Sequence, residues 1–225
     1  MRAPRAVVVV GGGGHAKVLV DLLLLLRWNV VGYTDLNPDS RELLGVSYVG
    51  RDDVVAKRWC PDEVDLVNGV GSVRLPDARA GVFEGFQRLG YTFPAIVHPA
   101  ASVSPNATVS EGAQIMAGAV VQAGSLIGPN VIVNTRASVD HDCDIGAHVH
   151  VAPGVVLSGG VQVGERAHIG CGATVRQAIT IGAGAVVGAG AVVIEDVAPG
   201  ITVAGVPAKP LRASRLTISR RSAGG

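Results

Sequence analysis

From Val97 onward the chain carries a hydrophobic residue at every sixth position. Stepping by six from Val97 to Val193 meets seventeen aliphatic residues, of which sixteen are Val or Ile. The position two residues before each of them holds a small or β-branched residue in nearly every repeat. Residues two apart on a strand share a face, so each unit sends both side chains inward and then turns a corner. Three units of six make one triangular coil, and the pattern predicts a prism of a little over five stacked parallel coils.

The first ninety residues follow a different pattern. Residues 6–15, AVVVVGGGGH, predict a buried strand that ends in a glycine-rich turn. A helix over Ala16–Leu26 and a strand over Asn29–Thr34 complete a βαβ opening. Further strands are predicted over Ser47–Val49, Leu66–Asn68 and Thr92–Ile96, and helices over Asp52–Arg58 and Pro76–Leu89. We expect a Rossmann-like α/β domain over 1–94, the prism over 95–212, and a disordered tail rich in Ser and Arg over 213–225.

Composition fits a narrow interior and excludes several classes of function. Hydrophobic residues make up 48% of the chain, yet only 3 Phe, 3 Tyr and 2 Trp are present beside 31 Gly. A net charge of +1 provides no field for nucleic acid or an acidic membrane surface. Three widely spaced cysteines form no disulfide framework, and no apolar stretch is long enough to span a bilayer. A soluble cytoplasmic protein is expected.

The glycine-rich turn is a candidate nucleotide site. Gly11, Gly12, Gly13 and Gly14 allow a ligand to approach the backbone at a helix N-terminus, where N–H groups favour phosphate. Asp35 ends the next strand, at the place where an acceptor for ribose hydroxyls would lie. The dinucleotide fingerprint is not met cleanly, because His15 and Ala16 occupy its later positions. Because no second mononucleotide half follows, an NAD-dependent role is disfavoured.

A polar cluster interrupts the prism between residues 134 and 168. His141 follows the inward Val139 by two residues at a corner, so it should point outward between Asp140 and Asp142. A histidine held by a carboxylate is suited to act as a general base. His150 and His168 lie one coil apart and should stack on one outer face. Two other interpretations remain open: the histidines could bind a metal, as in prism-shaped carbonic anhydrases, or the prism could be only a scaffold.

Motifs along almost the whole chain resemble one family. They are VVVVGGGGHAKV at the start, NGVGS at 68–72, IVHPAA at 96–101, VDHDCDIG at 139–146, SGGVQVG at 158–164 and AGVPAKP at 204–210. The chain is similar to the bacterial nucleotide-amino-sugar N-acetyltransferases and the related sialic acid O-acetyltransferases. These are hexapeptide-repeat acyltransferases built on a left-handed β-helix.

The resemblance implies a role for each candidate residue. His141 would be the catalytic base, with Asp142 as its acidic partner. The glycine turn, His15 and Asp35 would bind the nucleotide sugar, and Gly159 would offer a backbone N–H to the acetyl carbonyl. The residues implied in acetyl-CoA binding are Asn134, His150, Gly159, Gly188, Ala189 and Lys209, the last within the tail Val206–Lys209. Family members form trimers with active sites between subunits.

These observations predict a trimeric transferase that moves an acetyl group from acetyl-CoA to an amino sugar. The acceptor would be the amine of a 4-amino-4,6-dideoxy sugar linked to a nucleoside diphosphate, and the product would enter glycan assembly. Direct attack on the thioester is expected without an acyl-enzyme, because the register puts Cys143 inside the prism, and no metal is expected. O-acetylation of sialic acid or of a sugar hydroxyl is the alternative, and the sequence leaves UDP, GDP and dTDP open.

Overall fold

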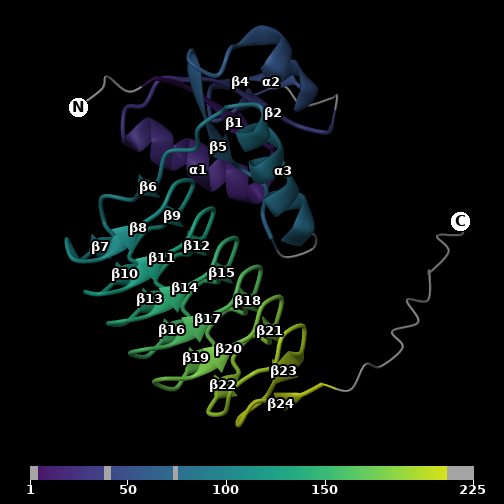
Figure 1. The fold of residues 1–225 in the computed structure, drawn as a ribbon. Helices are drawn as coiled ribbons and strands as arrows, with labels where there is room; N and C mark the ends of the chain where they lie inside the picture. The colour runs from purple at the N-terminus through teal and green to yellow at the C-terminus, as the bar shows by residue number, and fades with distance from the viewer. Residues whose placement is uncertain (1–4, 38–41, 73–75, 212–225) are drawn as a thin grey trace, which may run out of the picture.

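The computed structural model describes residues 5–37, 42–72 and 76–211. The predicted tail over 213–225 lies outside the described residues. Figure 1 shows an α/β unit at one end of a long stack of coils, with the last strand at the other end.

The α/β unit is a sheet with helices on both faces. Its elements are β1 (Ala6–Val10), α1 (Gly14–Leu25), β2 (Val30–Thr34), β3 (Glu42–Leu43), β4 (Val46–Gly50), α2 (Asp53–Arg58), β5 (Val64–Asn68) and α3 (Pro76–Arg88). The strand order is β3-β4-β2-β1-β5, and β1 runs parallel to β2 and β5. Val7 and Val9 pack on the side of α1, whereas Val8 and Val10 pack with Phe83 of α3.

One predicted strand is wrong. The sequence predicts a strand over Thr92–Ile96, but the first strand after α3 begins at Ile96. The backbone carbonyl of Thr92 still bonds the α/β unit, accepting the N–H of Leu66 at 2.9 Å. The next carbonyl, that of Phe93, accepts the N–H of Gly112 in the prism at 2.6 Å, and Pro94 has no N–H to give. The segment therefore crosses between the two units rather than extending the sheet.

The prism is a β-helix with three faces, made of parallel two-residue strands except at its end, where the second-last strand has three residues and the last strand is antiparallel. The first face holds β7 (Ser102–Val103), β10 (Val120–Val121), β13 (Ser138–Val139), β16 (Val156–Leu157), β19 (Thr174–Val175) and β22 (Val192–Val193). The second holds β8 (Thr108–Val109), β11 (Leu126–Ile127), β14 (Asp144–Ile145), β17 (Gln162–Val163) and β20 (Thr180–Ile181). The third holds β6 (Ile96–Val97), β9 (Gln114–Ile115), β12 (Ile132–Val133), β15 (His150–Val151), β18 (His168–Ile169), β21 (Val186–Val187), β23 (Thr202–Ala204) and β24 (Lys209–Pro210).

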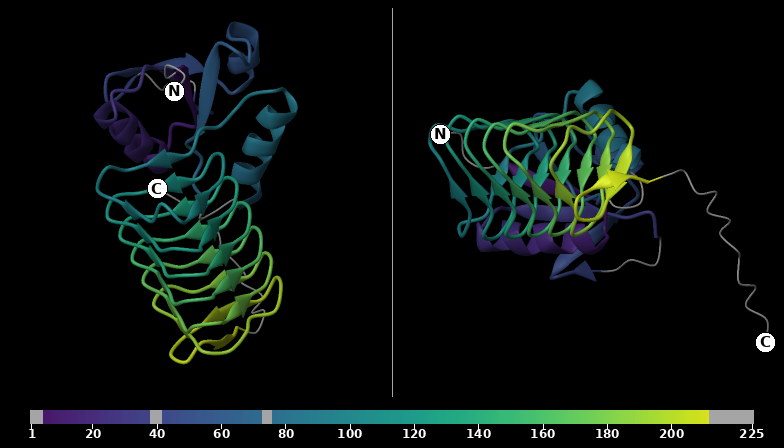
Figure 2. Two further views of the ribbon diagram at one scale, coloured as in Figure 1. Left: turned by 60° about the vertical axis from the view of Figure 1, so that its left-hand side comes forward. Right: turned by 90° about the horizontal axis from the view of Figure 1, so that it is seen from below.

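Both predicted inward registers fill the interior of the β-helix. Val139, Leu157 and Val175 are fully buried along one register, and Ala137, Val155 and Ala173 along the other. Cys143 lies in the same core, with 1% of its surface exposed. Figure 2 shows the coils stacked in register beneath the α/β unit. The predicted period of six thus defines which side chains point outward and can do chemistry.

Packing between the two units covers the first coils of the β-helix. Met116 and Ile132 of the third face are buried in one cluster with Leu19, Leu23 and other residues of the α1 side. On the far side of the contact, Phe83 of α3 packs edge-on to the His148 ring, with centroids 5.7 Å apart. The glycine-rich turns of the α/β unit are therefore held against the third face.

Candidate active site

His141 lies at a corner between the first and second faces of the β-helix. Its Nδ1–H donates to Asp142 Oδ2 at 2.8 Å, and its backbone N–H donates to Asp140 Oδ1 at 2.8 Å. The ring is 63% exposed. The hydrogen bond that His141 donates to Asp142, followed by the charge of Asp140, raises the pKa of His141 above its ordinary value. With Nδ1 held by the carboxylate, Nε2 is directed outward as a proton acceptor.

Gly159 lies directly beneath the ring of His141. A Cβ at this position would come within 2.5 Å of both Cε1 and Nε2 of the imidazole. Gly159 lies one coil further along the β-helix than His141, and its lack of a side chain leaves room for the imidazole ring. The sequence grouped Gly159 with the acetyl-CoA contacts, and the structure brings it to the histidine corner.

A cavity of about 570 Å³ lies along the third face. His150 and His168 pair in register there, as predicted, and their rings meet edge-on with centroids 5.0 Å apart. Cys171, which the sequence did not place in a site, contributes to the wall. The cavity brings together four of the predicted contacts, namely Asn134, His150, Gly188 and Ala189.

A second cavity of about 260 Å³ lies between the α/β unit and the third face. Its wall on the α/β side includes Gly14, His15 and Ser72, each from the end of a glycine-rich turn. Asn134 and His150 line both this cavity and the larger one. The two cavities are therefore neighbours that share these two side chains.

His15 is neutral at physiological pH because it is buried. Burial, reinforced by the positive charge of Arg79, lowers its pKa to about 4. Its Nε2 lies 2.7 Å from Oε1 of Gln114, whose Nε2 donates to the carbonyl of Asn68 at 2.9 Å. Since that bond turns the amide oxygen of Gln114 toward His15, the proton of His15 is on Nε2.

The first glycine turn leaves open space at the N-terminus of α1. Cβ atoms at Gly13 and Gly14 would meet nothing within 4 Å. A Cβ on Gly12, in contrast, would collide with the carboxylate of Asp35. The structure thus brings the predicted Asp35 against the turn, and free space remains where backbone N–H groups of a helix favour phosphate.

Arg79 is a structural residue of the site that sequence reasoning missed. It is 1% exposed on α3, and its Nη1 donates to the carbonyls of Asn68 at 2.9 Å and Val70 at 2.8 Å. Burial lowers the pKa of its guanidinium to about 9. The available signal was its spacing of one helical turn from Phe83, which puts a cation on the buried face of α3.

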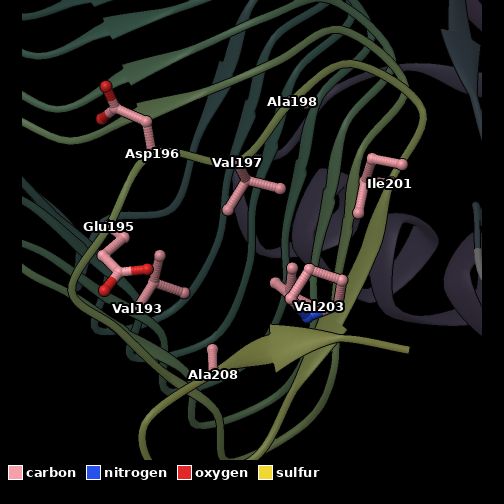
Figure 3. A pocket seen from close by; sticks show the side chains of 9 residues that line it. Val193, Glu195, Asp196, Val197, Ala198, Ile201, Val203 and Ala208 are labelled. Atoms are coloured by element: carbon pink, nitrogen blue, oxygen red, sulfur yellow. The ribbon is translucent and has the colours of Figure 1, made fainter. Parts of the chain in front are cut away.

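Lys209 lies at the opposite end of the β-helix from the α/β unit. Its Nζ is 3.4 Å from Oε2 of Glu195. A third cavity, of about 220 Å³, lies at this end of the β-helix. Its lining side chains, among them Val193, Val203 and Ala208, are drawn in Figure 3. The structure does not bring Lys209 into the cavity that holds His150.

His141 and the cavities lie on different parts of the prism. His141 follows β13 of the first face and precedes β14 of the second, whereas His150 belongs to β15 of the third face. Neither cavity includes His141 or Asp142 in its wall. In one chain, the predicted base is therefore separated from the predicted binding residues that line the two cavities.

Comparisons with known proteins match both units. Residues 6–80 match the family model described as the PglD N-terminal domain. The acetyltransferase domain of PglB from Neisseria gonorrhoeae is 41% identical, with a TM-score of 0.86 over 92% of this chain and 100% of that one. PerB from Caulobacter crescentus, solved with CoA and GDP-perosamine, is 38% identical, with a TM-score of 0.85 over 93% of this chain and 99% of that one.

This chain belongs to the bacterial sugar N-acetyltransferases.

Family membership confirms the predicted acyltransferase class and the left-handed β-helix. One solved member of the family is a perosamine N-acetyltransferase from C. crescentus in which a histidine is replaced by asparagine. WeeI from Acinetobacter baumannii, at 24% identity and a TM-score of 0.82, shares the fold. A search of curated proteins gave no significant match.

The histidines of this family member do not gather into a metal site. Within residues 5–37, 42–72 and 76–211, no three His, Cys, Asp or Glu side chains converge in a way that could hold a metal ion. His148, next to the cluster, turns instead toward Glu84 of α3, at 3.3 Å. None of the helices that the structure describes has both the length and the apolar character that crossing a membrane requires.

Proposed function

We propose that this protein transfers the acetyl group of acetyl-CoA to the amine of a nucleoside-diphosphate-linked 4-amino-4,6-dideoxy sugar. The observation that carries the proposal is the His141–Asp142 pair over Gly159, in a chain of the sugar N-acetyltransferase family. A second support is that PerB, at 38% identity, was solved with CoA and GDP-perosamine.

His141 acts as the general base in the proposed reaction. As the sugar nitrogen attacks the thioester carbonyl, Nε2 of His141 takes a proton from the amine, and Asp142 stabilises the imidazolium that forms. A C–N bond forms, the C–S bond breaks, and the thiolate leaves to be protonated. An acyl-enzyme on Cys143 is disfavoured, because its thiol is buried in the core and burial raises its pKa.

The two cavities are suited to the two substrates. We assign the nucleotide sugar to the cavity beside the glycine turn, with His15 and Asp35 as further contacts. The diphosphate would lie at the N-terminus of α1, where open space meets backbone N–H groups. The pantetheine arm of acetyl-CoA fits the larger cavity beside Asn134, His150, Gly188 and Ala189. Lys209 would contact a CoA phosphate, and Gly159 the acetyl carbonyl.

The site requires a second copy of the chain, because His141 lies on a different edge from both cavities. We propose a homotrimer in which His141 of one protomer faces the cavities of its neighbour. The three cysteines are all free, which suits a reducing cytoplasm, and the product would enter glycan assembly.

The test is release of free CoA thiol from acetyl-CoA with GDP-, UDP- and dTDP-linked 4-amino sugars. Wild type should release thiol with at least one of them, and His141→Asn should not, although it still binds CoA. Release only with sialic acid or another sugar hydroxyl would replace the proposal with O-acetylation. Absence of CoA binding by wild type would overturn the acetyl donor itself.

A further inference from the structure

Both glycine-rich turns of the α/β unit end on one column of outward side chains of the β-helix. This column runs down the third face through Gln114, Ile132, His150 and His168, which pair in register from coil to coil. His15, at the end of the first turn, bonds Gln114, and Ser72, at the end of the second, bonds Nδ1 of His150. Each turn is therefore joined to the column by one side-chain hydrogen bond, and the column can determine which partner in that bond is the donor.

The polarity of the Ser72–His150 bond can be derived from its neighbours. The backbone N–H of Thr135 donates to Asn134 at 2.8 Å, so the atom of Asn134 that faces it is the amide oxygen. The amide nitrogen of Asn134 then faces Nε2 of His150 at 3.0 Å. Because that NH₂ group can only donate, Nε2 of His150 must be the unprotonated nitrogen.

His150 is neutral, so its single proton lies on the other nitrogen. Burial is the main cause that lowers the pKa of His150 to about 3; repulsion by His168 and His15, once these are protonated, and by the charge of Arg79 adds to it. Its Nδ1–H therefore donates to Oγ of Ser72. A hydroxyl that accepts this bond has its own O–H left to donate elsewhere. Within the described parts of the chain, no other hydrogen bond to the Ser72 hydroxyl is present.

The remaining O–H of Ser72 belongs to the smaller cavity. Ser72 is 5% exposed and lines that cavity together with Gly14 and His15. His15, protonated on Nε2, presents Nδ1 as a hydrogen-bond acceptor. The first turn thus offers an acceptor and the second turn, through Ser72, a donor. A Cβ on Gly71 would lie 3.7 Å from Cβ of His15, which shows how closely the turns approach each other.

We propose that Ser72 is a specificity-determining residue whose hydroxyl is fixed as a hydrogen-bond donor to an oxygen of the nucleotide-linked sugar. This inference rests on the proposed function and names a contact for its acceptor substrate. The oxygen belongs to the sugar rather than to the diphosphate, because Ser72 lies at the side of the cavity shared with His150, where sugar and thioester must meet. A sugar that lacks an acceptor at this point leaves a buried donor unpaired.

The first measurement is the tautomer of His150 in the ligand-free protein. Long-range proton–nitrogen NMR on protein with ¹⁵N-labelled histidine, assigned with His150→Gln, should show a protonated Nδ1 and an unprotonated Nε2. The same tautomer is expected in Ser72→Ala, because Asn134 sets it. A protonated Nε2 in wild type would overturn the proposal, since Ser72 would then donate to His150.

The second measurement is calorimetric binding of the nucleotide sugar that wild type accepts, with GDP-perosamine as the first probe and its UDP- and dTDP-linked counterparts next. Ser72→Ala should weaken nucleotide-sugar binding about tenfold, with binding of the nucleoside diphosphate alone and of CoA changed less than about twofold. Ser72→Thr keeps the hydroxyl and should restore most of the affinity. The exposed Ser102→Ala is the matched control.

Two outcomes separate this inference from the proposed function. If wild type binds a nucleotide sugar and Ser72→Ala binds it equally well, the role of Ser72 is wrong and the function stands. Equal weakening of the nucleoside diphosphate and the nucleotide sugar would also overturn it, because the contact would then be to phosphate. If wild type binds none of the probes, the proposed function fails and the contact fails with it.

Discussion

His141 and His150 are nine residues apart and have opposite physical properties. His141 is at a corner, is 63% exposed, and has a raised pKa because Asp142 accepts its Nδ1–H. His150 is on a face, is 6% exposed, and has a pKa lowered to about 3 by burial. The place of a histidine within the six-residue unit thus decides whether it can exchange a proton or only hold a hydrogen bond.

The largest expected effect is on kcat, and it distinguishes a variant of His141 from a variant of His150. His141→Asn should lower kcat by about 10³-fold, because it removes the general base and little binding. His150→Asn should act mainly on KM for both substrates, because His150 lines both cavities. Steady-state thiol release measures both. If His141→Asn kept more than a tenth of the wild-type kcat, His141 would not be the general base.

Asp142→Asn should lower kcat/KM about thirtyfold at neutral pH, because it removes the partner that orients and strengthens the base. The carboxylate raises the pKa of His141, so its loss lowers that pKa. Since the reaction needs the unprotonated ring, the acidic limb of the pH profile should move to lower pH. Asparagine tolerates the backbone φ of 58° at this position. An unmoved acidic limb would contradict the pairing.

Gly159→Ala should reduce kcat about tenfold by pushing the ring of His141 away from Asp142, because the new Cβ would lie 2.5 Å from the imidazole. Thermal stability should change little, since the displaced group is the end of an exposed side chain. Gly81→Ala in α3 is the matched control, because its Cβ would meet nothing within 4 Å. Wild-type kcat in Gly159→Ala would show that the ring tolerates displacement.

The smallest expected effect is on acid stability, and it belongs to the buried histidines. His15 and His150 have folded-state pKa values of about 4 and about 3, both below the unfolded value of 6.5. The unfolded chain therefore binds more protons below about pH 6.5, and stability falls as pH falls toward 4. Each of the two histidines should lower the free energy of unfolding by roughly 1 kcal/mol per pH unit in that window. Urea unfolding at pH 6 and 5 measures the slope, which should flatten in His15→Gln/His150→Gln and stay unchanged in His141→Gln.

The sequence predicted what the repeat controls. The inward registers, the outward His141, the stacking of His150 on His168 and the buried Cys143 all follow from counting in units of six. The partners of Ser72, His15 and Arg79 could not be predicted this way. Ser72 and His150 are 78 positions apart, and their contact depends on how a folded α/β unit packs on a β-helix. The strand predicted over Thr92–Ile96 failed for the same reason, because its backbone bonds cross between the two units.

The in-register column on the third face fixes the distance between two hydrogen-bonding side chains, Gln114 and His150. Gln114 and His150 lie two coils apart with Ile132 between them, and each coil adds about 4.8 Å along the β-helix. The two side chains that bond His15 and Ser72 are therefore held apart by a whole number of coils. A coil inserted below Val193 would lengthen the molecule and leave this length unchanged. A coil inserted between Gln114 and His150 would carry His150 out of reach of Ser72 and break the hydrogen bond between them.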